Sequence, residues 1–289
     1  MFKQSILSLV LLMPVICSAD ITMQQGMQIL LSETQAQYNH SENQYVETYQ
    51  IATPIFQANK KLSEEKGLNA YRQLESLAQF GDVYSNYQLG HLQLQYQGIF
   101  GSSLKDAIRN LDIAEKGNVV HAQYALALSY RYKSKEISKI INVPASKLAG
   151  YESMQLLLKG AERGFGPSFL QACRDFELGT WFKKNLSNAS RCYQLAIEYH
   201  GEQKAMPFLA NLYLNNEEFK NSDNEAKALD YLIISSQWYQ DEYSLALLGR
   251  YYILNGQTAE QKTKGKDLLN QAIKLGSNDA KQFYKQLIK

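Results

Sequence analysis

The sequence predicts an all-α solenoid of stacked antiparallel helix pairs, and three observations support this prediction. In the stretch 104–132, two apolar-periodic runs are separated by Gly117, and the first run spaces its apolar residues along one helix face. An Ala-x-x-Gly helix ending recurs along the chain, and a small residue recurs in the helix after it. Both markers repeat every 36 to 47 residues or so, roughly the period of helical repeat proteins.

The helix endings show the period most clearly. They are Ala78…Gly81, Ala114…Gly117 and Ala161…Gly164, with looser versions at Gly201 and Gly276, and Gln240 where the period expects a glycine. The small residues that keep the same rhythm are Gly90, Ala127, Ala172, Ala210 and Gly249. Glycine at such an ending favours a left-handed residue that closes the helix, so we expect Gly117 and its counterparts to adopt this conformation.

Short motifs around these markers resemble a known repeat family. Leu89-Gly90 follows Tyr87, Leu248-Gly249 precedes Tyr251, and two helices end in Ala-Glu-Lys-Gly117 and Ala-Glu-Arg-Gly164. These motifs resemble Sel1-like repeats, relatives of the tetratricopeptide repeat, over roughly Gly67 to Lys289. The resemblance implies a right-handed superhelix that serves as an adaptor or scaffold surface. From the residues themselves we expect no catalytic groups and no cofactor.

Residues 1–19 have the pattern of a cleaved signal peptide. Lys3 precedes an apolar run, and Cys17-Ser18-Ala19 places small residues before a cleavage point at Asp20. The alternative is a lipoprotein signal with Cys17 as the lipidated residue, although bulky Ile16 stands where such signals carry a small residue. We therefore expect a periplasmic or secreted protein that has no integral membrane segment after signal removal.

Charge excludes one class of partner. The chain has a formal net charge of +2, and loss of Lys3 with the signal lowers it to about +1. No long basic run is present, so the usual footprint of a nucleic-acid-binding protein is missing.

The repeats divide the chain into four parts. We expect the signal peptide at 1–19, an N-terminal helical cap at 20–66, the repeat array at 67–276 and a C-terminal capping helix at 277–289. Segment 20–66 lacks clear repeat markers, and a partner-binding arm is the alternative to a cap on the first repeat. The long interval between markers indicates an insertion at Lys133–Ser146, which is apolar for a loop and either folds back or docks onto a partner.

Three fragments imitate the motifs of a penicillin-interacting serine enzyme. Ser63-Glu64-Glu65-Lys66 fits S-x-x-K, Ser222-Asp223-Asn224 fits S-D-N, and Lys262-Thr263-Lys264 is one residue short of K-T-G. Such enzymes need the last motif on a strand, and no strand is predicted here. We interpret Ser222 and Asp223 as caps of a helix that begins near Glu225. The four histidines are dispersed along the chain, without the spacing of a metal site.

Tyrosine is unusually frequent in the composition, with 20 residues. Tyr87, Tyr124, Phe169 and Phe208 share one repeat position and are interpreted as packing residues. Seven others lie at or beyond the ends of first helices, which line the concave face in this architecture: Tyr84, Tyr96, Tyr130, Tyr132, Tyr213, Tyr251 and Tyr252. Their rigid, polar-tipped rings suit a protein or polysaccharide partner, and a tyrosine-rich core is the alternative.

The loop between two later helices carries Trp181 and Phe182 at its tip. These two rings either contact a partner or tuck over the neighbouring loop. Cys173 and Cys192, the cysteines that remain after signal removal, lie equally far from this loop on consecutive helices. Residues equidistant from the turn of an antiparallel hairpin face each other, and an exported protein is oxidised, so we predict a structural disulfide.

The sequence therefore predicts a protein–protein interaction scaffold or adaptor of the bacterial cell envelope, with a macromolecular partner on its concave face. An immunity protein that neutralises a secreted antibacterial toxin is the alternative function. A penicillin-interacting hydrolase is the third, and the fold expectation disfavours it.

Overall fold

Helices make up the regular structure of the described residues. The computed structural model describes residues 20–31, 64–96, 98 and 101–288, and within these ranges there is no strand. The predicted signal peptide and most of segment 20–66 lie outside the described residues. None of the described helices combines the length and the apolar character needed to cross a bilayer.

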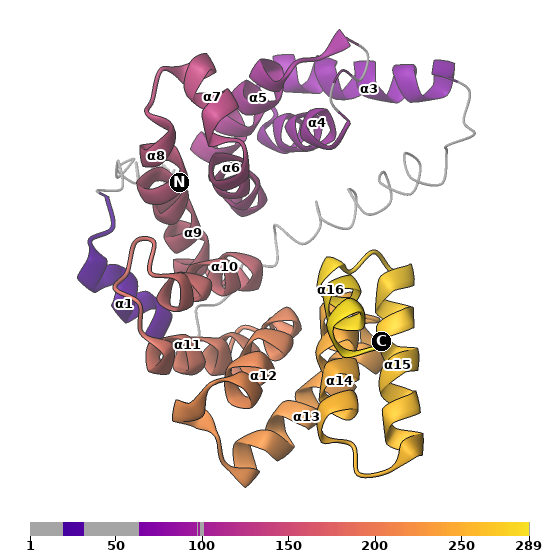
Figure 1. Ribbon diagram of the computed structural model, residues 1–289. Coiled ribbons are helices and arrows are strands. Elements are labelled where there is room, and N and C mark those ends of the chain that lie inside the picture. The colour runs from indigo at the N-terminus through magenta and orange to yellow at the C-terminus, as the bar shows by residue number, and fades with distance from the viewer. Residues whose placement is uncertain (1–19, 32–63, 97, 99–100, 289) are drawn as a thin grey trace, which may run out of the picture.

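Five helix pairs follow one another along the described chain. They are α4 (Val83–Gln95) with α5 (Leu104–Lys116), α6 (Val120–Tyr132) with α9 (Ser153–Glu162), α10 (Gly166–Leu178) with α11 (Leu186–Glu198), α12 (Met206–Asn215) with α13 (Ser222–Trp238), and α14 (Glu242–Asn255) with α15 (Ala259–Lys274). Helix α3 (Glu64–Gln79) precedes the first pair and α16 (Asn278–Leu287) follows the last. The pairs form an arc whose inner side carries the first helices (Figure 1), which confirms the predicted all-α solenoid.

A residue with positive φ separates each second helix from the next first helix. These residues are Gly81, Asn118, Gly164, Gly201, Gln240 and Gly276. The period thus places the turn correctly at Gln240, although a glutamine occupies it. At Gly117 the expectation was wrong by one residue, because Asn118 adopts the left-handed conformation with φ 66°. Gly117 has φ −79° and is small because a Cβ atom there would collide with Val83 of α4.

The repeated aromatic and small residues build the core, as predicted. Phe169 is fully buried, and Tyr87, Tyr124 and Phe208 pack against the same core cluster. Ala127, Ala172 and Ala210 are fully buried as well. Small side chains at this position let the helices of neighbouring pairs approach closely.

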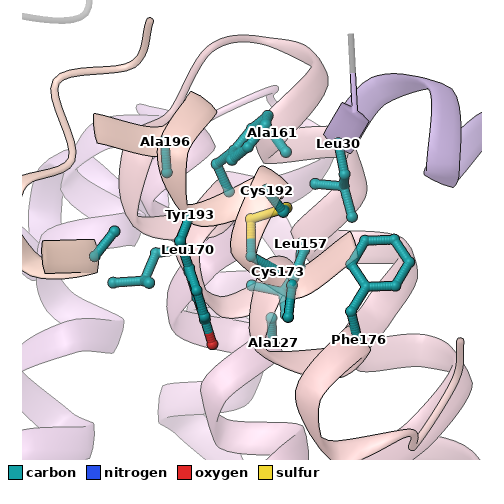
Figure 2. Close-up of a cluster of buried hydrophobic side chains, with 14 of the residues drawn as sticks. Leu30, Ala127, Leu157, Ala161, Leu170, Cys173, Phe176, Cys192, Tyr193 and Ala196 are labelled. Atoms are coloured by element: carbon teal, nitrogen blue, oxygen red, sulfur yellow. A yellow bond between two sulfur atoms is a disulfide. The ribbon is translucent and has the colours of Figure 1, made fainter. Parts of the chain in front are cut away.

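A disulfide joins the third helix pair. Cys173 of α10 and Cys192 of α11 are bonded, with their Cα atoms 5.5 Å apart, and both cysteines are fully buried. Figure 2 shows the bond inside a cluster that includes Leu157, Phe176 and Leu30. The predicted pairing is therefore present, within the Cα separations that disulfides adopt.

The insertion at Lys133–Ser146 is helical rather than a loop. It forms α7 (Ser134–Ile141) and starts α8 (Ala145–Lys147), which leads through a π-helical turn, η2 (Leu148–Glu152), into α9. Ile137 is fully buried, and Ile141 and Val143 pack against the core. Helix α7 contacts α5 and α6, so of the two expectations the segment follows the first and folds back onto the array.

Helix α1 (Met23–Leu31) lies where we did not expect it. It contacts α9, α10 and α11 in the middle of the chain instead of covering the first repeat. Gln155 of α9 pairs with the backbone of Ile21, accepting a hydrogen bond from its N–H (2.7 Å) and donating one to its carbonyl oxygen (2.8 Å). The Tyr151 hydroxyl donates to the Asp20 carboxylate at 2.6 Å. Together with fully buried Leu30, these contacts fix the segment 20–31 on the second helices.

Two short 3-10 helices, η3 (Gln203–Ala205) and η4 (Glu217–Phe219), complete the described elements. Helix α13 begins at Ser222, earlier than predicted, and its N-cap is Asn221. The Asn221 side chain accepts a hydrogen bond from the Asn224 N–H at 2.9 Å. The predicted capping role of Ser222 and Asp223 therefore belongs to the residue before them.

Candidate partner-binding surface

A groove runs along the inner side of the arc where the first helices begin. Its volume is roughly 710 Å³, and α6, α10, α12, α14 and α16 contribute to its lining together with the turns before them. The lining includes Tyr124, Gln171, Arg174, Glu202, Phe208 and Tyr243. We call this surface the inner groove. A surface built from successive repeats can contact an extended partner at several points.

Phe208 lies at the centre of the inner groove. Its ring centroid is 5.5 Å from that of Tyr243 and 5.9 Å from that of Tyr193. The guanidinium carbon of Arg174 lies 4.7 Å from the Phe208 ring centroid, in a cation–π contact. The Nε atom of Arg174 is buried and has no hydrogen-bond partner among the described residues. Aromatic rings and a stacked arginine are the side chains that most often dominate binding energy at protein interfaces.

Groups of both charges surround this aromatic centre. Burial raises the pKa of Glu202, whose carboxylate accepts a hydrogen bond from the Lys204 N–H at 3.1 Å. Asp241 caps α14 by accepting from the Ser244 N–H at 2.6 Å. Burial also raises the pKa of Tyr243 to about 12, so its hydroxyl stays protonated and able to donate. A groove with mixed charge and neutral tyrosine hydroxyls suits a polypeptide better than a polyanion.

The fold of the chain is similar to that of a solved Sel1 repeat protein. A Sel1 repeat protein from Oxalobacter formigenes matches with a TM-score of 0.57 and 23% sequence identity, over 75% of this chain and 86% of that one. The chain has the Sel1-like repeat fold. A protective antigen of uropathogenic Escherichia coli with an SLR fold gives a TM-score of 0.40 at 14% identity, over 89% and 69% of the two chains. No protein-family model and no curated protein sequence matches the chain.

Within this Sel1-like fold, the predicted contact tyrosines differ in exposure. Tyr132 is 72% exposed and Tyr96 is 40% exposed, whereas Tyr213 is only 4% exposed. The remaining four, Tyr84, Tyr130, Tyr251 and Tyr252, are half-buried. For Tyr213 the predicted contact role is corrected, because it is a core residue. Its hydroxyl accepts a hydrogen bond from the Gln194 side chain at 2.7 Å. Six of the seven tyrosines lie nearer the C-terminal ends of the first helices than the residues that line the inner groove. The seventh, Tyr84, lies in the first turn of α4, at the position that Tyr243 occupies in α14.

Tyr213 and Tyr251 both line a smaller pocket of roughly 200 Å³ between α12, α13 and α14. The Tyr251 hydroxyl donates to the Glu225 carboxylate at 2.6 Å. Arg250 donates from Nη1 to the Asn215 side-chain oxygen at 3.0 Å. These polar groups are paired with one another, so the pocket offers a partner fewer free contacts than the inner groove does.

The predicted contact at the loop tip is wrong for Phe182. Its ring stacks on Phe176 at 4.4 Å and is 2% exposed. Buried Asp175 holds the loop by accepting hydrogen bonds from the backbone N–H groups of Trp181 (2.8 Å) and Phe182 (2.6 Å) and from the Thr180 hydroxyl. Trp181 packs edge-on against Phe182 and is half-buried. The loop thus folds onto its own repeat.

The fragments that imitate a penicillin-interacting enzyme lie on helices of the Sel1-like fold. Ser222-Asp223-Asn224 opens α13 and Lys262-Thr263-Lys264 lies inside α15, whereas Ser63 is outside the described residues. The K-T-G motif of such enzymes must lie on a strand, so its place in a helix removes the geometric basis for that function. Among the described residues, no group of three or more metal-ligating side chains comes together.

Sequence reasoning missed Arg174 and Tyr243 as candidate contact residues. It identified the repeat position of Tyr124 and Phe208 and interpreted these two rings as packing, which they also do. The available signal was the period itself, because it places Arg174 and Phe208 on neighbouring first helices. What the period does not give is the orientation of Arg174 onto the ring of the next repeat.

Proposed function

We propose that this protein is an exported scaffold or adaptor that binds a protein partner in its inner groove. The observation that supports this most directly is the stack of Arg174, Phe208 and Tyr243 in a groove that four first helices and α16 line. The core fixes these side chains before a partner arrives, so binding would cost less conformational entropy than it would with mobile loops.

Export is part of the proposal and rests on two features. Residues 1–19 have the composition of a cleaved signal peptide. The chain also forms a buried disulfide between Cys173 and Cys192, and disulfides persist in oxidising compartments such as the bacterial periplasm. The partner would then be a protein of the cell envelope or of the medium.

The partner can be identified by site-specific crosslinking. A photo-crosslinking amino acid replaces Tyr243 in the inner groove, and the control carries it at exposed Tyr239, outside the groove. The proposal expects a crosslinked protein from the periplasmic fraction at Tyr243 that is absent at Tyr239. Equal labelling at both positions would contradict binding in the groove.

Binding of the identified partner is then measured with purified variants. Arg174→Ala removes the stacked guanidinium and should weaken the complex by about tenfold or more, because central arginines are frequent interface hot spots. Lys227→Ala changes an exposed lysine of α13 and should leave affinity unchanged. Cell fractionation and intact mass test export: the mature protein should begin at Asp20.

A further inference from the structure

The outer side of the solenoid contains a second groove, between α13 and α15. Its volume is roughly 560 Å³. Ile233, Leu245, Leu248 and Leu268 line it, and its remaining lining is glutamine, serine and lysine apart from Leu275 at one end. We call it the outer groove. It differs from the inner groove in position, because two second helices form its walls and the first helix α14 forms its floor.

Comparison with an earlier repeat explains why the outer groove is open. The left-handed residues Gly164 and Gln240 precede α10 and α14, and Gly201 and Gly276 follow α11 and α15. Counting from these residues matches Leu245 with Phe169 and Leu275 with His200.

These two residues of the earlier repeat are rings in contact with each other. Phe169 is fully buried, and the Phe169 and His200 ring centroids lie 4.2 Å apart. Their leucine counterparts are smaller, and Leu275 is 50% exposed. The replacement of two rings by leucines helps to leave open space at the outer groove.

The chain already binds a helix on the corresponding set of three helices. Helix α1 contacts α9, α10 and α11, which are a second helix, a first helix and a second helix, like α13, α14 and α15. Leu30 of α1 becomes fully buried there, next to the disulfide (Figure 2). A short amphipathic helix is therefore a ligand that the outer side of this architecture accommodates.

Charge indicates what kind of helix the outer groove would take. The charged residues that line it are Lys264 and Lys274, and no carboxylate lines it. The Lys264 Nζ atom lies 5.1 Å from the Tyr252 ring centroid, in a cation–π contact that fixes its position. Helix α1 has no acidic residue in its first turn and no basic residue in its last, so a second copy of α1 would not complement these lysines.

We propose that the outer groove binds an amphipathic helix of a partner protein, one that carries acidic residues beside its apolar face. The apolar face would cover Ile233, Leu245 and Leu268, and the acidic flanks would meet Lys264 and Lys274. Apolar burial would supply affinity and the lysines would set orientation. With the inner groove facing the other way, the protein would hold two partners at once.

The test uses a synthetic probe and the full mature chain. The probe is a fluorescent peptide of about 14 residues, with leucine at helical i, i+3, i+4 and i+7 spacing and glutamate on the flanks. A matched peptide carries lysine in place of each glutamate. Fluorescence anisotropy should show saturable binding of the glutamate peptide and binding about tenfold weaker for the lysine peptide. No saturable binding, or equal binding of both peptides, would overturn the proposal.

Two variants locate the binding. Leu245→Phe with Leu268→Phe, the filled variant, places larger side chains in the lining of the outer groove and should abolish probe binding while the thermal unfolding midpoint is kept. Lys274→Glu should weaken binding about tenfold, whereas Lys281→Glu on α16, also exposed, makes the same charge change elsewhere and should have no effect. Unchanged binding to the filled variant would overturn the proposal.

Two further controls test whether the probe occupies the outer groove alone. Arg174→Ala alters the inner groove and should leave probe binding unchanged, so failure of the proposed function and failure of this inference can be told apart. Self-association of the mature chain that disappears in the filled variant would make a second copy the occupant and would also overturn the proposal. Analytical ultracentrifugation measures this directly.

Discussion

Gly249 of α14 and Gly265 of α15 lie against each other at the crossing point of the last helix pair. A Cβ atom on Gly249 would lie 2.9 Å from the Gly265 carbonyl oxygen, and one on Gly265 would lie 2.8 Å from the Gly249 carbonyl oxygen. Both contacts are with backbone, which cannot rotate away. This pair therefore lets α14 and α15 approach more closely than side chains would permit.

The first prediction follows from this contact. Gly249→Ala should lower the free energy of unfolding by about 1–3 kcal/mol, because the methyl group forces the two helices apart. Urea denaturation followed by circular dichroism measures the change. Gly150→Ala is the matched control, since Gly150 lies in a helical turn with nothing within 4 Å of an added Cβ. The control should be neutral or stabilising by up to about 1 kcal/mol, and equal losses in both variants would refute the packing argument.

Gly249 illustrates what sequence could predict, whereas its partner Gly265 carries no periodic marker and was not identified. Gly90 and Gly249 were identifiable because a period set by one marker recurred in a second, and a solenoid repeats its packing contacts with its sequence. The disulfide was predictable for a related reason, since Cys173 and Cys192 flank one turn. Such contacts depend on short separations along the chain.

Contacts between distant or aperiodic segments could not be predicted in this way. Helix α1 carries no repeat marker, and its docking through Gln155 joins residues 134 positions apart. The exposure of single side chains could not be predicted either. Tyr213 is covered by a side chain of α11, and Phe182 is covered by the fold of its own loop. Position along a helix predicts the face on which a residue lies but not what later covers it.

The second prediction concerns the insertion. Since Ile137 is fully buried, replacing Lys135–Pro144 with a Gly-Ser linker should lower the thermal unfolding midpoint. Replacing an exposed docking loop would leave the midpoint unchanged. Ile137→Ala alone should lower the free energy of unfolding by about 2–4 kcal/mol. Lys139→Ala on the exposed side of α7 is the control and should change stability by less than about 0.5 kcal/mol. A linker variant as stable as the parent would mean that the insertion is dispensable for folding.

The third prediction concerns the disulfide, which closes a sequence separation of 19 residues. Replacing both cysteines with alanine should lower the free energy of unfolding by about 3 kcal/mol, chiefly because the unfolded chain regains freedom. Reductant should bring the parent protein close to the variant. Intact mass after denaturing alkylation provides a direct check: no alkyl group should add before reduction and two should add after it. Two additions without reductant would disprove the bond in the mature protein.

The last prediction is a pH dependence that comes from His121. Its ring lies 4.7 Å from the Phe165 ring and 5.6 Å from the Tyr87 ring, measured between centroids. Burial lowers the pKa of His121 to about 4, with smaller contributions from nearby His91 and Arg163, and burial lowers the pKa of His91 as well. The folded protein thus holds both rings neutral, whereas an unfolded histidine has a pKa of about 6.5.

The sign follows from proton binding. Below about pH 6.5 the histidines of the unfolded chain bind protons that the same residues in the folded chain do not bind. The free energy of unfolding therefore falls as the pH is lowered from 7 towards 4. For His121 the loss reaches about 3 kcal/mol at most. His121→Phe keeps an aromatic ring and removes the titration, so its stability should depend less steeply on pH between 7 and 5 than that of the parent. Burial raises the pKa values of Asp175 and Glu202, which act in the opposite direction, but both residues are present in the parent and in the variant, so the difference between the two curves reports His121. Parallel stability curves for the two proteins would show that His121 does not titrate differently on folding.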